Sequence, residues 1–393
     1  MPTLPTNVDL GFAPELVGIA ELLHSITKGA CNEFLCIPSS FDRSARSFGF
    51  FARSPATVFP SYPLPFGSRA GVVMTADARR LAWALLSRAA SGPCPALCAL
   101  VAQEGVEEAA AAVAAGDVPM LINHRVLERA NAGAAQRDLE LMYRLGGRFV
   151  TPDDDEWPGE LMAVFDSVGD DPDFAPPLGL WVRGRLCLRV VTEKAIAVVG
   201  ARCCTGYGER VTTDIVGELA VRGWTIVSGA AFGIDAIAHR SALAAGGATV
   251  AVMACGVDRT YPSQHESLLA EIAESGLIVS EVPPGTAVSK SQFLARNRLT
   301  AGLSGAVLAV EAGLRSGTTN TIRWANRLGR PALAVPGPVT SAASAGCHRM
   351  IGDGRTRLVS CTEDVLAATA VSPPAAASPA TGIGEDAAQG IRR

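Results

Sequence analysis

The stretch "VVGARCCTGYGERV", residues 198–211, decides the class of fold. Its apolar run ends at Gly200, a loop containing Gly206 and Gly208 follows, and a helical pattern then begins. A strand that turns into a helix over glycines is an arrangement with which many proteins hold a phosphate. The stretch contains neither the G-x-G-x-x-G pattern for dinucleotides nor the G-x-x-x-x-G-K-[ST] pattern for nucleoside triphosphates. Because this turn also carries Arg202, the kind of ligand that it binds has to be inferred from the other motifs of the sequence.

Apolar and amphipathic segments alternate after Lys194. We expect strands at Ala195–Val199, Thr225–Ser228, Ala248–Ala254, Leu277–Val282, Ala306–Glu311 and Pro331–Val335. The helices between them are expected to begin near Tyr207, Gly233, His265, Gln292 and Thr318. Short apolar strands separated by helices indicate a parallel sheet covered on both faces. The sequence therefore predicts an α/β fold with a Rossmann-like, doubly wound, mostly parallel sheet.

The remaining chain divides by composition. Residues 1–73 are rich in Pro, Ser, Phe and Gly, and we expect this extension to be poorly ordered, with Met74 as a candidate start of translation. Residues 74–145 read as a small all-helical domain, and residues 146–367 as the domain that holds the sheet. Residues 368–393 form an Ala/Pro/Ser-rich tail for which we expect disorder.

Composition excludes several classes of protein. There is no uninterrupted apolar run long enough to span a membrane and no secretory signal pattern, so a cytoplasmic protein is expected. The ten cysteines have no spacing typical of zinc sites, so we expect reduced thiols and no metal. The net charge of −4 conceals two opposite regions. Residues 151–177 carry nine acidic and no basic residues, whereas residues 286–330 carry seven basic residues and one glutamate.

Ligands of such sheets bind beyond the carboxyl ends of the strands, and two of those ends suit a phosphate. At the first, Gly200 permits close approach of the backbone and Arg202 offers a planar guanidinium. At the second, Ser228 and Gly229 begin a strand-to-helix turn with free N–H groups.

The helix after that second turn carries two further polar residues. Asp235 and His239 stand four residues apart, either as a structural hydrogen bond, which we favour, or as a catalytic dyad.

The segment "SKSQFLARNRLTAGLS", residues 289–304, mixes cations with an aromatic ring. Lys290, Arg296 and Arg298 surround Phe293 in the sequence. Proteins that bind single-stranded nucleic acid combine cations for the backbone with an aromatic ring for a base. The alternative is that Phe293 is a buried core residue. The segment "EAGLRSGTTNT", residues 311–321, adds hydroxyl and N–H donors just before a helix, at Ser316, Gly317 and Thr318.

Together these segments resemble the DNA-processing protein A family (DprA, also called Smf). The motifs "VGARCCTGYG", "VSGAAFGIDAIAH", "GVDRTYP", "SEVPPG", "FLARNRLTAGLS", "VEAGLRSGTTNT", "ALAVPGP" and "SAGCHRMIGDG" occur in the family's order, between about Phe149 and Ala367. The resemblance implies an extended Rossmann fold that binds single-stranded DNA, works as a dimer and loads the RecA recombinase onto the strand during natural transformation. It also implies that Arg202, Lys290, Phe293, Arg296 and Arg298 contact DNA and that Ser316, Gly317 and Thr318 contact phosphate.

Two departures from that family limit the comparison. The family's asparagine in "SxGxNxLI" is replaced here by His348, and the tail is too short for the winged-helix domain in which many members end.

The favoured interpretation is a non-catalytic, sequence-independent binder of single-stranded DNA that needs no cofactor. The alternative is a Rossmann-like nucleotide hydrolase, a phosphoribohydrolase resembling the lysine-decarboxylase-like family, with Glu281 and Glu311 as spare carboxylates at strand ends. That family's P-G-G-x-G-T-x-x-E motif is not matched by "EAGLRSGTTNT". A dehydrogenase is less favoured, because no acidic residue follows the second strand to bind a ribose.

Overall fold

The computed structural model describes residues 73–165 and 174–370, with side chains from Ala78 onward. Most of the extension predicted for residues 1–73 and most of the tail predicted for residues 368–393 lie outside these ranges. The predictions of disorder there, of a start at Met74 and of the domain boundaries stay predictions. All described residues fall within one compact unit.

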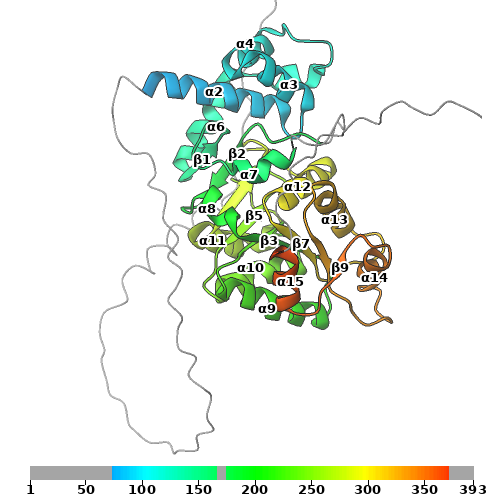
Figure 1. The fold of residues 1–393 in the computed structure, drawn as a ribbon. Coiled ribbons are helices and arrows are strands. Elements are labelled where there is room, and N and C mark those ends of the chain that lie inside the picture. The colour runs from blue at the N-terminus through cyan, green and yellow to red at the C-terminus, as the bar shows by residue number, and fades with distance from the viewer. Residues whose placement is uncertain (1–72, 166–173, 371–393) are drawn as a thin grey trace, which may run out of the picture. The chain divides into compact units, whose positions relative to one another are not determined.

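The described strands form one nine-stranded sheet in the order β1-β2-β6-β5-β4-β3-β7-β8-β9 (Figure 1). Their bounds are β1 (Gly147–Val150), β2 (Leu180–Arg183), β3 (Ala195–Val199), β4 (Thr225–Ser228), β5 (Thr249–Val252), β6 (Leu277–Ser280), β7 (Ala306–Ala309), β8 (Ala332–Ala334) and β9 (Arg357–Leu358). Strands β3 to β9 pair in parallel, and β2 runs antiparallel to both β1 and β6. The predicted α/β fold with a mostly parallel sheet is confirmed.

Five helices connect the parallel strands and begin within two residues of their predicted starts. They are α9 (Gly206–Val221), α10 (Ile234–Ala244), α11 (Glu266–Ser275), α12 (Lys290–Gly302) and α13 (Thr318–Arg327). Shorter helices complete this part of the chain: α7 (Gly159–Met162), η1 (Ala163–Phe165), α8 (Leu188–Glu193), η2 (Ser263–His265), α14 (Ala345–Gly352) and α15 (Thr362–Ala370).

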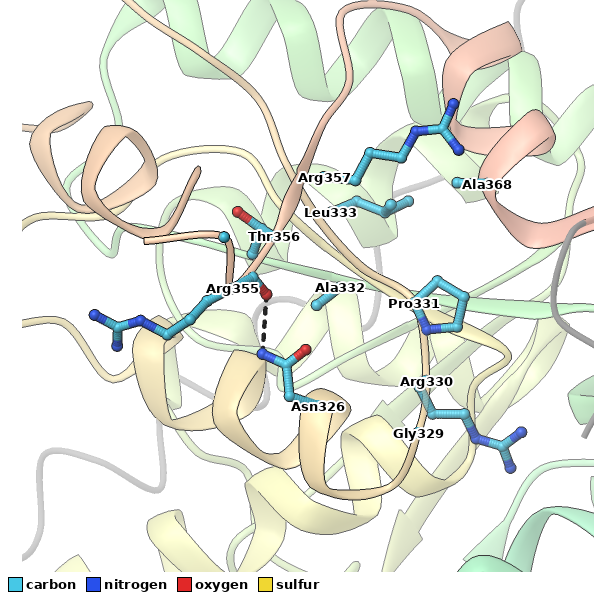
Figure 2. Close-up of a pocket in the computed structure, with 11 residues that line it drawn as sticks. Asn326, Gly329, Arg330, Pro331, Ala332, Leu333, Arg355, Thr356, Arg357 and Ala368 are labelled. Carbon is cyan, nitrogen blue, oxygen red and sulfur yellow. Dashed lines mark hydrogen bonds between the residues drawn. The ribbon is translucent and has the colours of Figure 1, made fainter. Parts of the chain in front are cut away.

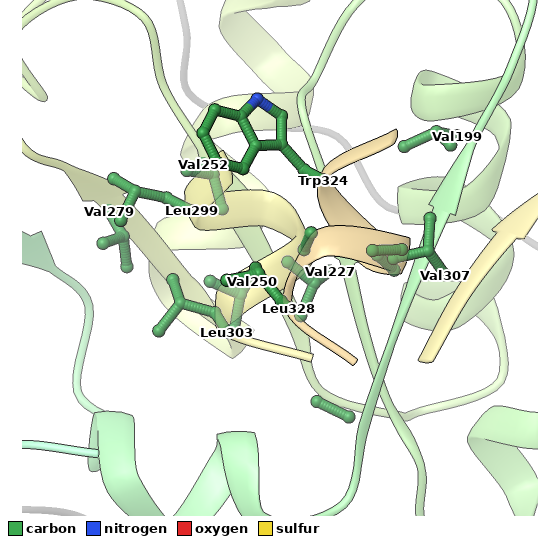
Figure 3. Close-up of a cluster of buried hydrophobic side chains, with 14 of the residues drawn as sticks. Val199, Val227, Val250, Val252, Val279, Leu299, Leu303, Val307, Trp324 and Leu328 are labelled. Atoms are coloured by element: carbon green, nitrogen blue, oxygen red, sulfur yellow. The ribbon is translucent and has the colours of Figure 1, made fainter. Parts of the chain in front are cut away.

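Strands β3 to β8 bury their side chains on both faces of the sheet, which is why they are mostly apolar. Val199, Val227 and Val250 pack with Leu299 of α12 and Trp324 of α13 on one face (Figure 3). Ile196, Val198 and Ile226 point to the other face and pack with α9, α10 and α15. This alternation within each strand produces the doubly wound arrangement.

The helical region before the sheet shares its core with the sheet. It contains α2 (Val73–Ala90), α3 (Pro95–Glu104), α4 (Val106–Ala115), α5 (His124–Arg129) and α6 (Ala132–Arg144). Leu86, Leu97 and Val106 belong to one buried cluster with Trp181 of β2 and Ile278 of β6. The helices therefore rest on the β2–β6 end of the sheet.

The acidic segment before β2 attaches α2 to the sheet. Asp153 accepts hydrogen bonds from Nε of Arg79 (2.8 Å) and Nε1 of Trp83 (2.6 Å), and Asp154 pairs with Arg80 (2.7 Å). Glu156, which is buried, pairs with Arg148 of β1. Three residues of the acidic run, Asp153, Asp154 and Glu156, thus neutralise arginines of α2 and of β1.

Strand β3 lies at the point where the strand order reverses. The chain runs from β3 to β4, β5 and β6 on one side and then crosses to β7 on the other. Neighbouring loops diverge at such a point, which leaves a crevice at the carboxyl ends of the strands. The loops after β3, β4 and β7 meet there, and they carry Arg202, Gly229 and Ser316.

No helix among the described residues combines the length and the apolar composition that a membrane crossing requires.

Candidate nucleic-acid interface

The turn after β3 is anchored by a carboxylate from β7's end of the sheet. Glu311, which is buried, accepts hydrogen bonds from the backbone N–H (2.9 Å) and the hydroxyl (2.6 Å) of Thr205. A Cβ at Gly208 would fall 2.3 Å from Oε2 of Glu311, so glycine is required there for the carboxylate to fit. Glu311 thus occupies the start of α9, where nucleotide-binding proteins hold a phosphate. This explains why a glycine-containing turn lacks both nucleotide patterns.

Arg202 extends from that turn into solvent and lies over an aromatic ring. Its guanidinium carbon is 5.6 Å from the centroid of the Phe293 ring. Phe293 is half-buried, so the alternative of a fully buried core phenylalanine is wrong. A guanidinium over a ring face is attracted by the ring and keeps N–H groups available for a second partner.

Helix α12 holds Phe293 and Lys290 on one side. Ser289 caps the helix by accepting the N–H of Gln292 (3.3 Å), which fixes Lys290 in the first turn. Residues three apart on a helix lie on neighbouring positions of its surface, and Lys290 is exposed one turn before Phe293. The structure thus brings Arg202 into contact with Phe293 and places Lys290 on the same helix, whereas a contact of these residues with DNA stays a prediction.

Arg296 lies beneath this surface. Its Nη1 donates to the carbonyl of Val252 (2.5 Å), and a Cβ at Gly229 would fall 2.1 Å from the same nitrogen. Burial lowers the pKa of Arg296, while the charge of Asp235 raises it. The residue is only 7% exposed, so it supports the loop after β4 from below.

Arg298 is completely buried and forms an ion pair with Glu281. Its guanidinium carbon also lies 5.6 Å from the centroid of Phe165. This placement disagrees with the predicted contact to DNA, because no solvent reaches the guanidinium in this structure. The spacing of three cations around Phe293 did not reveal that α12 turns the third of them into the core.

Ser228, Gly200 and Gly233 shape the turns after β3 and β4. The Ser228 hydroxyl is buried and donates to the carbonyl of Val198 (2.7 Å), so it points into the sheet and away from the crevice. Gly200 is needed because a Cβ there would lie 2.5 Å from Ile234 of α10. Gly233, with φ +75°, adopts a backbone conformation that favours glycine.

Asp235 and His239 bond elsewhere, and neither the predicted structural hydrogen bond between them nor the dyad is formed. Asp235 accepts the N–H of Ala231 (3.3 Å), and burial raises its pKa. Thr249 donates to the carbonyl of Ile226 (2.7 Å), so its oxygen accepts from Nδ1 of His239 (2.7 Å). Burial lowers the pKa of His239 to about 3. Both residues therefore stabilise the fold.

The start of α13 is open. Gly317 is exposed at the cap position and would tolerate a Cβ without a clash. Ser316 donates its hydroxyl to Oγ1 of Thr318 (2.9 Å) and accepts the backbone N–H of Thr318 (3.2 Å). Thr318 is buried, so Ser316 and Gly317 form the outer surface of this turn.

The two spare carboxylates of the hydrolase alternative are both engaged. Glu281 pairs with Arg298, and burial raises its pKa; Glu311 binds Thr205. Among the described residues, no group of three or more His, Cys, Asp or Glu side chains is placed to hold a metal. In the turn after β3, Cys203 is exposed and Cys204 is half-buried, and both are free thiols.

His348 replaces the expected asparagine and contacts the loop after β8. Its Nε2 lies 3.2 Å from the nitrogen and 3.0 Å from the oxygen of Gly337. The imidazole thus contacts the backbone here in either tautomer.

A pocket at the opposite edge of the sheet is lined by Arg330, Arg355 and Arg357, near the amino ends of β8 and β9. Figure 2 shows their guanidinium groups pointing apart. Arg355 pairs with Asp353, and Arg330 donates to the carbonyl of Leu161 (3.3 Å). Because the three guanidinium groups do not converge on one point, this pocket does not form a common anion site.

Two aromatic residues of the crevice were not predicted as site residues. Tyr261 lies 5.5 Å, centroid to centroid, from Phe293, and it is 40% exposed. Phe232 is 42% exposed and makes an edge contact with His265 (4.8 Å). An aromatic residue in a loop after a parallel strand is the signal that could have identified them.

The sequence matches the protein family described as DNA recombination-mediator protein A over residues 148–370. A provisionally named DNA processing protein DprA from Mycobacterium tuberculosis is 47% identical over 292 residues, which cover 74% of this chain and 75% of the relative. The DNA processing protein DprA of Streptococcus pneumoniae is 38% identical over 218 residues, covering 54% of this chain and 71% of the relative. The X-ray structure of a Streptococcus pneumoniae DprA superposes with a TM-score of 0.59 and 28% identity, over 74% of this chain and 97% of that one.

Proposed function

The chain belongs to the DNA recombination-mediator protein A family, and from this membership we propose that it binds single-stranded DNA without regard to sequence and delivers the strand to the RecA recombinase. The observation that carries the proposal is the contact between Arg202 and the half-buried Phe293 ring at the crevice. Arg202 and Lys290 contact phosphates, and Phe293 stacks on a base.

A single strand fits this surface better than a duplex does. Bases in a duplex are stacked on one another, whereas bases of a single strand have free faces that an aromatic ring can cover. Stacking is tolerant of sequence because every base has such a face. The neighbouring cations attract the backbone, and this attraction weakens as salt rises.

The open turn at Ser316 and Gly317 provides a further phosphate contact. It lies after β7, next to the β3 turn that carries Arg202. A backbone that passes Arg202 therefore comes within reach of the N–H groups at the start of α13.

The protein acts as a homodimer and without catalysis. We infer both properties from the family and not from a contact in this chain. The absence of catalysis is also supported by Glu281 and Glu311, because both carboxylates already bind other residues of the chain. Loading of RecA, and its use when the cell takes up DNA, belong to the same proposal.

Fluorescence anisotropy of the full chain tests the proposal. A labelled oligo-dT and a duplex of equal length are titrated at several salt concentrations. We expect preference for the single strand and a steep loss of affinity with salt. Equal affinity for both, or no binding by the folded protein, would refute it. Release of free base from nucleoside monophosphates would instead support the hydrolase alternative.

The delivery step needs its own measurement. RecA filament formation on oligonucleotide coated with a single-strand-binding protein is followed with and without the chain. Faster filament growth is expected, and an unchanged rate despite tight DNA binding would reject delivery while leaving the binding proposal intact.

A further inference from the structure

Three aromatic side chains reach solvent on successive segments of the carboxyl edge of the sheet. Phe232 lies in the loop after β4, Tyr261 in the loop after β5, and Phe293 on α12 after β6. These three strands are adjacent in the sheet. Phe232 and Tyr261 are 42% and 40% exposed, and Phe293 is half-buried. Covering the exposed part of an aromatic ring is favourable, so three such rings at one edge indicate a ligand that covers them.

The rings are connected by contacts. Phe293 lies between Arg202 (5.6 Å) and Tyr261 (5.5 Å), and its ring is tilted by 54° to that of Tyr261. The turn that begins with Tyr261 continues into η2, whose last residue, His265, meets Phe232 edge-on at 4.8 Å. Arg202, Phe293, the Tyr261–His265 turn and Phe232 thus form a continuous row.

The row is held in place from beneath. His265 is buried, and its Nδ1 lies 3.0 Å from the carbonyl of Ala230, two residues before Phe232. On the other side of the Tyr261 loop, Nε of Arg259 donates to the carbonyl of Gly285 (2.9 Å). A ring whose supporting loop is already fixed loses little conformational entropy when a ligand arrives.

We propose that Tyr261 and Phe232 are additional base-stacking residues, so that the strand runs from Arg202 over Phe293 and onward across the Tyr261–Phe232 surface. This inference rests on the proposed function and adds the path of the strand to it. The rings of Phe232 and Phe293 carry no group that could read a base edge, and stacking on any of the three rings suits any base. The ligand class is therefore a run of consecutive unstacked nucleobases.

The test compares Tyr261→Ala and Phe232→Ala with the wild-type full chain on oligo-dT. Each substitution is expected to weaken binding by about 5- to 150-fold, the range for loss of one base stack. The slope of log affinity against log salt should stay unchanged, because no cation is removed. Tyr261→Phe and Phe232→Tyr should restore the affinity, since each keeps an aromatic face.

A second oligonucleotide distinguishes stacking from a loosened loop. On an oligonucleotide of abasic residues only the backbone remains, so Tyr261→Ala and Phe232→Ala should bind as the wild type does. Tyr143→Ala, at a 63% exposed tyrosine on α6, is the matched control and should change neither affinity.

The failures of the inference and of the proposed function look different. If Tyr261→Ala and Phe232→Ala bind oligo-dT normally while Phe293→Ala does not, the inference is overturned and the proposed function stands. A loss of equal size on the abasic oligonucleotide overturns the inference as well. If the wild type itself fails to bind oligo-dT, the proposed function fails.

Discussion

Replacing Glu311 by alanine should loosen the turn that carries Arg202. The carboxylate accepts two hydrogen bonds from Thr205, at 2.9 Å and 2.6 Å, and a hydrogen bond to a charged group contributes about 1.5 to 3 kcal/mol. Thr205 is exposed and can bond to water after the change, so the lower value applies to each bond. We therefore expect the free energy of unfolding of Glu311→Ala to fall by about 3 kcal/mol.

Urea unfolding followed by far-UV circular dichroism measures this loss. Glu311→Gln keeps an acceptor oxygen and should lose about half as much, because only the charge and one acceptor position change. Glu209→Gln is the matched control, since Glu209 is an exposed acid in the first turn of α9 and its loss should stay below about 0.5 kcal/mol. A midpoint for Glu311→Ala no lower than that of Glu209→Gln would show that the carboxylate does not anchor the turn. Oligo-dT affinity should fall with stability in Glu311→Ala, because Arg202 lies in the loosened loop.

Three further outcomes are expected. Arg202→Ala should reduce the slope of log affinity against log salt by about 0.7, the value for one phosphate of a single strand, whereas Arg202→Lys and Arg222→Ala, at the far end of α9, should keep the slope. Arg298→Met should lower the free energy of unfolding, measured by urea denaturation, by about 3 to 5 kcal/mol, because Glu281 is left buried and unpaired. Normal stability together with an altered salt slope would instead support the predicted contact of Arg298 with DNA. His239 is neutral in the fold, with its pKa lowered to about 3, so stability is lost as pH falls below its ordinary value of 6.5. From pH 7 to pH 5 this loss is about 2 kcal/mol, and unfolding of His239→Gln measured at both pH values should show a smaller decrease than the wild type.

The interface was only partly readable from the sequence. The sequence predicts Arg202, Lys290 and Phe293 as DNA contacts because cations beside an aromatic residue follow predicted strand ends. For Tyr261 and Phe232, which we propose as further stacking residues, the sequence shows only an aromatic residue in a loop after a parallel strand, and it does not tell whether such a ring points inward or outward. The sequence does not predict the antiparallel strands β1 and β2, because they flank an acidic, proline-containing segment and do not alternate with helices.

The sequence by itself determined the alternation of strands and helices from β3 to β8 and the edge of the sheet at which we propose that the ligand binds. Both follow from local physics, since the period of apolar residues decides the element and parallel strands all end at one edge. Only the tertiary structure decided which polar side chains at that edge face the solvent. Arg298 and Glu311 are polar residues next to the predicted site, yet each is buried by a partner distant in sequence, Glu281 and Thr205 respectively. Such partnerships depend on how the loops after different strands converge, and no local pattern in a chain encodes that convergence.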